Sequence, residues 1–196
     1  MSDGRDAVVA RVHALEAAAA RWDGHEPGRG DVLAALARSI GAQLGMSGDE
    51  LAELALAARL HDVGKLHIPA PVLRRRGPLT ESEWALVQTH PARGAEMLRR
   101  LPGMGAVAAV VGLHHERMDG QGYPHALEGD RIPLGARILA VCDAYAALTS
   151  ERPYRPALTA DAALAELQDS SGQFDPAVVR VLADQVLLAP ASSGRG

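Results

Sequence analysis

The chain has 196 residues, a formal net charge of -4, a hydrophobic fraction of 47% and an aromatic fraction of 3%. The negative charge argues against a large DNA- or RNA-binding surface, and no apolar run reaches the roughly 20 residues needed to span a bilayer. The single cysteine, Cys142, excludes an internal disulfide, and the N-terminus lacks the basic and apolar regions of a secretory signal. We therefore expect a cytoplasmic protein that is not in the membrane.

The first half of the chain predicts helices. Apolar residues recur at helical spacing over residues 6–22, and a second helix is expected over 31–44, after a break that contains Gly and Pro. Ser47 opens a capping box for a third helix that ends near His61, and Thr80 opens another capping box.

The second half predicts helices around one long loop. Helices are expected over 107–117, 133–149 and 159–167, and Asp175 caps the last one. Residues 119–133 are rich in Gly and Pro and are expected to form a loop. No segment predicts a convincing strand. The fold class is therefore all-α, a single-domain helical bundle, with an N-terminal helix at 1–22, the domain at 23–187 and a disordered tail at 188–196.

Several polar residues occur where helices should be apolar. A charge at such a position is costly unless it holds a metal or a partner. The residues concerned are His61, Asp62, His90, His114, His115 and Asp143. They come from different helices or their ends, as in the metal sites of helical bundles. Imidazole and carboxylate ligands suit iron, manganese or zinc better than calcium or magnesium.

Each of these residues also has a simpler explanation when it is taken alone. His90 could be a core histidine, the pair of His114 and His115 a solvated helix face, and Asp143 a buried cap. A shared metal site explains them together. Cys142 is expected to be a small core residue, and no ligand role is expected for the exposed or packed histidines His13, His67 and His125.

Long motifs in a fixed order now suggest a family. They are His61-Asp62-Val63-Gly64-Lys65, Thr89-His90-Pro91, the stretch from His114-His115-Glu116 to Gly122-Tyr123-Pro124, Asp143-Ala144-Tyr145, and Arg152-Pro153-Tyr154-Arg155. Over residues 23–187 the chain resembles the HD-GYP domains, bacterial phosphodiesterases of the HD superfamily that degrade cyclic di-GMP. The loop at 119–133, called the GYP loop below, carries the motif that names this family.

The resemblance implies a chemistry and a set of roles. Two divalent metal ions, iron or manganese in the first place and zinc, nickel, cobalt or magnesium as alternatives, would activate a hydroxide that hydrolyses cyclic di-GMP to pGpG, GMP or both. The implied metal ligands are His61, Asp62, His90, His114, His115 and Asp143, with Asp62 bridging and also catalytic. Lys65 is implied in catalysis, and Lys65, Tyr123, Arg152 and Arg155 in substrate binding.

The chain departs from the family pattern at Arg29, which aligns where family members carry a further histidine. Arginine keeps its proton and offers no lone pair, so it cannot bind a metal. In one interpretation, His25 compensates as a ligand. In the other, Arg29 replaces the charge of a metal or binds substrate phosphate. The chain is then either a phosphodiesterase with two metals or a degenerate module that binds cyclic di-GMP or a partner protein with little or no hydrolysis.

HD-GYP domains commonly follow a receiver or sensor domain, and no such domain is expected within this sequence. The apolar face of the first helix, formed by Val8, Val12, Leu15 and Ala19, is expected to pair with a second copy of the chain or with a signalling protein.

Overall fold

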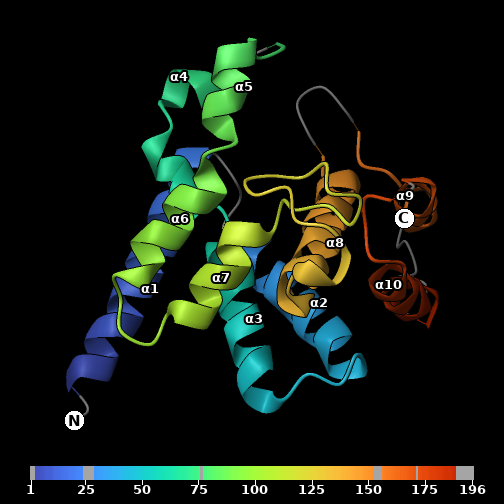
Figure 1. Ribbon diagram of the computed structural model, residues 1–196, viewed down its shortest axis with the longest axis horizontal. Coiled ribbons are helices and arrows are strands. Elements are labelled where there is room, and N and C mark those ends of the chain that lie inside the picture. The colour runs from blue at the N-terminus through green and yellow to red at the C-terminus, as the bar shows by residue number, and fades with distance from the viewer. Residues whose placement is uncertain (1–2, 24–28, 76, 152–155, 171, 189–196) are drawn as a thin grey trace, which may run out of the picture.

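The computed structural model describes residues 3–23, 29–75, 77–151, 156–170 and 172–188, and they form a bundle of helices (Figure 1). The all-α prediction is confirmed. The described ranges contain no strand, only one isolated antiparallel bridge between Asp119 and Glu128 at the base of the GYP loop. None of the helices in these ranges is both long and apolar enough to cross a membrane.

The first half of the bundle contains α1 (Asp3–Asp23), α2 (Arg29–Gln43), α3 (Gly48–Leu60), the 3-10 turn η1 (Val63–His67), α4 (Ala70–Leu73), α5 (Glu81–Val87) and α6 (His90–Arg99). The second half contains α7 (Gly105–Leu113), the 3-10 turn η2 (Gly129–Arg131), α8 (Leu134–Thr149), α9 (Ala160–Asp169) and α10 (Pro176–Leu188). Most of the predicted tail, residues 189–196, lies outside the described residues.

Local sequence signals explain where several helices begin. The hydroxyl groups of Ser47 and Thr80 accept hydrogen bonds from the backbone of Glu50 and Glu83, whose carboxylates accept from the two cap residues in return. Both predicted capping boxes are therefore present. The helix predicted over 107–117 is too long, because α7 ends at Leu113 and the chain then turns into the GYP loop.

One continuous core holds the helices together. α2 packs on α3, α6 on α7, and α8 on α2 and α9. Its fully buried members include Leu33 of α2, Leu54 of α3, Leu98 of α6 and Leu139 of α8. Cys142 is also buried here, as expected of a small core residue. Figure 1 shows α4 and α5 projecting from one end of the bundle and α9 and α10 along one side.

Helix α1 packs against this core. Val12 and Ala19 are buried and Leu15 packs against the core. For Val12, Leu15 and Ala19 the expectation that this face pairs with another subunit is therefore corrected, because they pack on the chain's own core and α1 contacts α3, η1 and α4. The Val8 side chain lies outside the described part of the chain. Pairing between subunits stays a prediction that would need other residues.

Two polar contacts fasten α1 on either side of the segment that carries His61 and Asp62. The Arg59 guanidinium donates to both Glu16 carboxylate oxygens, at 2.8 and 3.0 Å. The Trp22 indole donates to the Ile68 carbonyl at 3.0 Å. The N-terminal helix thus supports the segment from both flanks.

Candidate metal centre

Three of the candidate ligands stand at or just beyond helix ends. His61 follows α3, His114 follows α7, and His90 opens α6, three residues after α5 ends at Val87. The Nδ1–H group of each ring donates to the carbonyl three residues earlier, at 2.8, 2.8 and 2.7 Å respectively. The last carbonyls of a helix lack partners within the helix, so each imidazole satisfies one of them.

These hydrogen bonds fix which nitrogen is left for a metal. With Nδ1 occupied, the lone pair of a neutral ring lies on Nε2. Backbone carbonyls commonly orient metal-binding histidines in this way. The negative ends of the α3 and α7 dipoles also favour a cation near His61 and His114. The three rings are therefore prepared as ligands before any metal binds.

His90, His114 and His115 form the histidine side of the centre. Their candidate ligand atoms lie within 4.8 Å of one another, and the His90 and His114 Nε2 atoms are 3.4 Å apart. Burial lowers the pKa of all three, that of His115 to about 4, with neighbouring histidines adding to the effect for His114 and His115. The rings are thus neutral near pH 7, the form that binds a divalent metal.

Asp62 joins this group to the other half of the centre, which contains His61 and Asp143 and is called the carboxylate side below. Its Oδ1 atom lies 3.5 Å from His90 Nε2, and its Oδ2 atom lies 3.2 Å from His61 Nε2. His61 Nε2 is in turn 3.6 Å from Asp143 Oδ1. One carboxylate therefore faces both sides, which is the arrangement expected of a bridging ligand.

The carboxylate side attracts positive charge. Burial opposes protonation of His61, but the charges of Asp62 and Asp143 and hydrogen bonds to both outweigh it and raise its pKa to about 10. Burial would raise the pKa of each carboxyl, but the charge and hydrogen bonds of His61 act against it, with Lys65 adding to the effect on Asp62, and the pKa of both carboxyls is lowered. The proton on His61 lies between two carboxylates, and a divalent metal that replaced it would meet the same ligand set. The residues present therefore fit a metal on each side of Asp62.

Lys65 lies beside this bridging carboxylate. Its Nζ atom donates to Asp62 Oδ2 at 2.9 Å, across one turn of η1, and both side chains are 17% exposed. Gly64 allows this turn to reach α6, because a Cβ atom there would meet the His90 carbonyl and lie 2.6 Å from the Gly94 nitrogen. The close approach brings Asp62 to His90.

The GYP loop covers His115. The Tyr123 ring stacks on the His115 ring with 4.9 Å between centroids and 29° between planes, and the Tyr123 N–H donates to the His115 carbonyl at 3.1 Å. A Cβ atom at Gly122 would lie 2.6 Å from both the Glu116 Cα atom and the His115 oxygen, so only glycine fits there. Tyr123 thus reaches the centre as predicted.

Glu116 is a residue of the site that the sequence did not reveal. It is 4% exposed, and its carboxylate accepts from the His125 N–H at 2.7 Å and the Leu127 N–H at 2.9 Å. It therefore ties the GYP loop to the segment that carries His114 and His115. In the sequence, the position of Glu116 directly after the histidine pair and before a Gly-rich loop was the feature that could have indicated this role.

The structure brings together His61, Asp62, Lys65, His90, His114, His115, Tyr123 and Asp143. Arg29 reaches the same place, with its Nη2 atom 4.0 Å from Asp143 Oδ1. His25, Arg152 and Arg155 lie outside the described residues, so their predicted roles stay predictions.

Curated relatives share most of this chain. It is 47% identical over 148 residues to a cyclic di-GMP phosphodiesterase response regulator of Xanthomonas campestris, which covers 73% of this chain and 39% of that protein. It is 41% identical over 159 residues to a cyclic di-GMP phosphodiesterase of Pseudomonas aeruginosa, covering 81% and 38%. It is 37% identical over 164 residues to the 3'3'-cGAMP-specific phosphodiesterase 3 of Vibrio cholerae, covering 83% and 36%. The chain therefore spans about two fifths of the length of these relatives.

Solved structures share the fold. The crystal structure of a cyclic GMP-AMP-specific phosphodiesterase of Vibrio cholerae superposes with a TM-score of 0.69 and 24% identity, covering 91% of this chain and 49% of that one. An HD-GYP-type protein of Bdellovibrio bacteriovorus superposes with a TM-score of 0.67 and 22% identity, covering 81% and 51%. The family model described as HD domain matches residues 6–178. The chain therefore belongs to the HD domain family, and its motifs place it in the HD-GYP group of that family.

Proposed function

We propose that the chain is a metal-dependent phosphodiesterase that hydrolyses cyclic di-GMP to pGpG, GMP or both. The observation that carries the proposal is the position of Asp62, whose two oxygens lie 3.5 Å from His90 Nε2 and 3.2 Å from His61 Nε2. A carboxylate shared by two ligand groups is the arrangement that a two-metal hydrolytic centre requires.

Six residues would hold the two metals. His90, His114 and His115 serve one side, His61 and Asp143 the other, and Asp62 serves both. Divalent ions there would supply positive charge against a phosphate and lower the pKa of a bound water. The mixed imidazole and carboxylate set favours iron or manganese, with zinc, nickel, cobalt and magnesium as alternatives.

The chain's own residues prepare the site for an anionic substrate. Lys65 holds Asp62 in place and adds a positive charge beside the scissile phosphate. Tyr123 presents an aromatic ring next to His115, where it can stack with a guanine base. Arg152 and Arg155 are proposed to bind the phosphates. The buried thiol Cys142 suits a reducing compartment, and we place the protein in the cytoplasm.

A second substrate has support from the relatives. Proteins specific for 3'3'-cGAMP are 36–38% identical to the chain, and proteins named as cyclic di-GMP phosphodiesterases are 37–47% identical. The two nucleotides differ in one base, so the same metal centre serves both. Cyclic di-GMP is therefore the first candidate, and 3'3'-cGAMP is the alternative within the same reaction.

A function in binding without hydrolysis is the other alternative, and the position of Arg29 near Asp143 favours it. A cation beside a ligand carboxylate can weaken metal binding without preventing nucleotide binding. The chain would then act as a receptor for the nucleotide or as a module that binds a partner protein.

One experiment separates these functions. The purified protein is loaded with Mn²⁺ or Fe²⁺, and turnover of cyclic di-GMP and of 3'3'-cGAMP is followed by chromatography of the products. Asp62→Asn and His90→Gln are expected to reduce turnover at least a thousandfold, whereas His67→Gln, at an exposed histidine of η1, leaves it unchanged. Nucleotide binding without turnover in the unaltered protein would refute the phosphodiesterase and establish the binding module.

A further inference from the structure

Arg29 stands at the carboxylate side of the centre. Its Nη2 atom lies 4.0 Å from Asp143 Oδ1, the same oxygen that lies 3.6 Å from His61 Nε2. The Arg29 and Asp143 side chains are 22% and 24% exposed, so solvent screens the pair only in part. The permanently charged Arg29 and the candidate metal ligand His61 therefore lie near the same oxygen atom of Asp143.

Packing fixes the position of Arg29. It is the first residue of α2, where a positive charge opposes the helix dipole and needs a compensating anion. A Cβ atom on the next residue, Gly30, would lie 3.2 Å from Glu16 Oε1 and 3.5 Å from Arg59 Cα. Asp31 also lies 3.4 Å from an Arg59 nitrogen. The start of α2 is thus fixed against α1 and α3, which directs Arg29 to Asp143.

Protein cations already lie beside both carboxylates without metal. Asp62 and Asp143 bring two negative charges, Lys65 lies 2.9 Å from Asp62, and Arg29 lies beside Asp143. Each carboxylate therefore has its own protein cation. The guanidinium cannot lose its proton to make room for a metal, and it offers no lone pair.

We propose that Arg29 is a built-in cation that competes with the divalent ion at the Asp143 side of the centre. Its charge reduces the affinity of this side for divalent ions and limits how many of them the chain binds. The inference rests on the proposed metal centre but not on the substrate, because its test measures metal binding in the absence of nucleotide.

The test titrates metal-free protein with Mn²⁺ alone and measures the number of bound ions and their dissociation constants by calorimetry and elemental analysis. Arg29→Gln, which removes the charge and adds no ligand, is expected to tighten Mn²⁺ binding about tenfold. Arg29→Lys keeps the charge and is expected to bind as the unaltered chain does. Arg29→His replaces the charge with a ligand and is expected to bind one more ion per chain.

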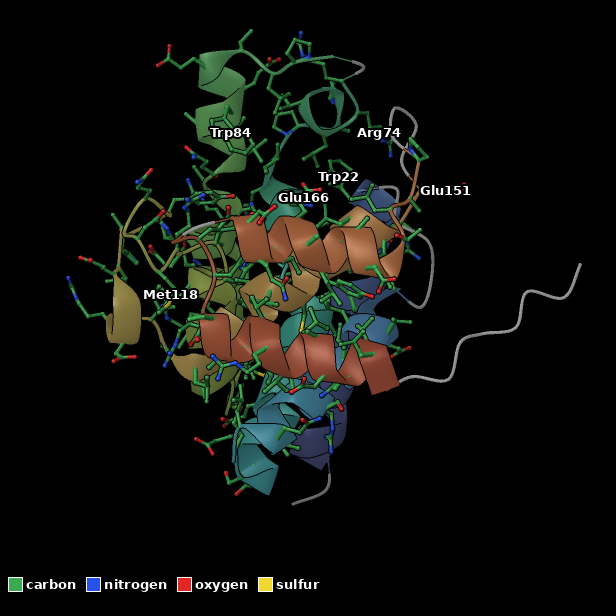
Figure 2. The ribbon with its side chains drawn as sticks, turned by 90° about the vertical axis from the view of Figure 1, so that its right-hand side faces the viewer. Trp22, Arg74, Trp84, Met118, Glu151 and Glu166 are labelled. Carbon is green, nitrogen blue, oxygen red and sulfur yellow. The ribbon has the colours of Figure 1, made fainter. Side chains whose placement is uncertain are left out.

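Arg74→Gln and Arg74→His are the matched controls, because Arg74 is exposed at the end of the molecule formed by α4 and α5 (Figure 2). Both should bind Mn²⁺ as the unaltered chain does. Equal or weaker binding by Arg29→Gln, or an unchanged ion count in Arg29→His, would overturn the inference. If Arg29→Gln does not fold, Arg29→Met removes the same charge. An unaltered chain that binds no Mn²⁺ would instead refute the proposed metal centre.

Discussion

The Tyr123 ring stacks on the His115 ring, and the backbone N–H of Tyr123 donates to the His115 carbonyl. A loop residue therefore holds a candidate metal ligand through both its side chain and its main chain. Burial raises the pKa of the Tyr123 hydroxyl, so it keeps its proton throughout the neutral range. The ring of Tyr123 is available to a substrate as a neutral, flat surface.

Replacing Tyr123 tests the ring and the hydroxyl separately. Tyr123→Ala removes a stacking contact of about 1 kcal/mol and is expected to raise KM about fivefold. Tyr123→Phe keeps the ring and should stay within about threefold of the unaltered chain. Steady-state kinetics and metal analysis of both variants check this. Equal losses in Phe and Ala would assign the role to the hydroxyl instead.

Glu116 should act through the GYP loop and not through the metals. Glu116→Gln leaves one of the two partly buried N–H groups without its carboxylate acceptor, a loss of about 1–3 kcal/mol, and frees the loop that carries Tyr123. We expect KM to rise while the number of bound metals is unchanged. Glu128→Gln, at an exposed position of the same loop, is the control. Loss of metal from Glu116→Gln would contradict the positioning role.

Gly64 should not tolerate a methyl group. In Gly64→Ala the new Cβ would meet the His90 carbonyl and the Gly94 nitrogen, and backbone on both sides leaves little room to adjust. We expect stability to fall by about 2–3 kcal/mol, together with weaker metal binding, because η1 must move away from α6. Gly48→Ala, with open space around it, should be neutral or stabilising in denaturant titrations. Equal stabilities would refute the close approach.

The sequence predicts the helices well, and it points to the polar residues that the structure brings together, because both depend on local patterns. The capping boxes at Ser47 and Thr80 and the polar residues within apolar runs are visible in the letters alone. It also indicates that Arg29 brings charge toward the centre, although not that Asp143 is its partner. The end of α7 and the function of Glu116 were missed, since both depend on how the GYP loop folds back on the chain.

The metal-free protein should lose stability in acid through its neutral histidines. His90, His114 and His115 have lowered pKa values in the fold, so below about pH 6.5 the unfolded chain binds more protons than the folded one. Their contribution therefore falls from about pH 6.5 down to about pH 4, the value for His115. Denaturant titrations with a chelator at pH 5 and pH 7 measure it. Greater stability at pH 5 would contradict the prediction.

His61 should act in the opposite sense. Its pKa is raised to about 10 by the two carboxylates, so its contribution is complete below about pH 6.5 and is lost as the pH rises through 10. The same titrations at pH 7 and pH 9 should show a decline that is absent in His61→Gln. A decline of equal size in that variant would assign the effect to another group.

Trp22 should stabilise the ligand segment from a distance. Trp22→Phe keeps an aromatic side chain but loses the indole N–H and its hydrogen bond to the Ile68 carbonyl, which is expected to cost about 1 kcal/mol. Hydrogen exchange should become faster over residues 61–68 and remain unchanged in α9. Trp84→Phe is the control, because Trp84 is 49% exposed on α5 (Figure 2). Unchanged exchange in Trp22→Phe would mean that packing alone holds α1.

The hydrogen bonds of Glu16 and Trp22 couple movements of α1 to the metal centre. Glu16 and Trp22 are six positions apart, about 9 Å along the axis, and they face directions roughly 120° apart around it. A sliding movement of α1 would push Arg59 and Ile68 the same way, whereas a turn about its axis would pull them in different directions. The segment between them, which holds His61 and Asp62, would be carried along by the first motion and distorted by the second.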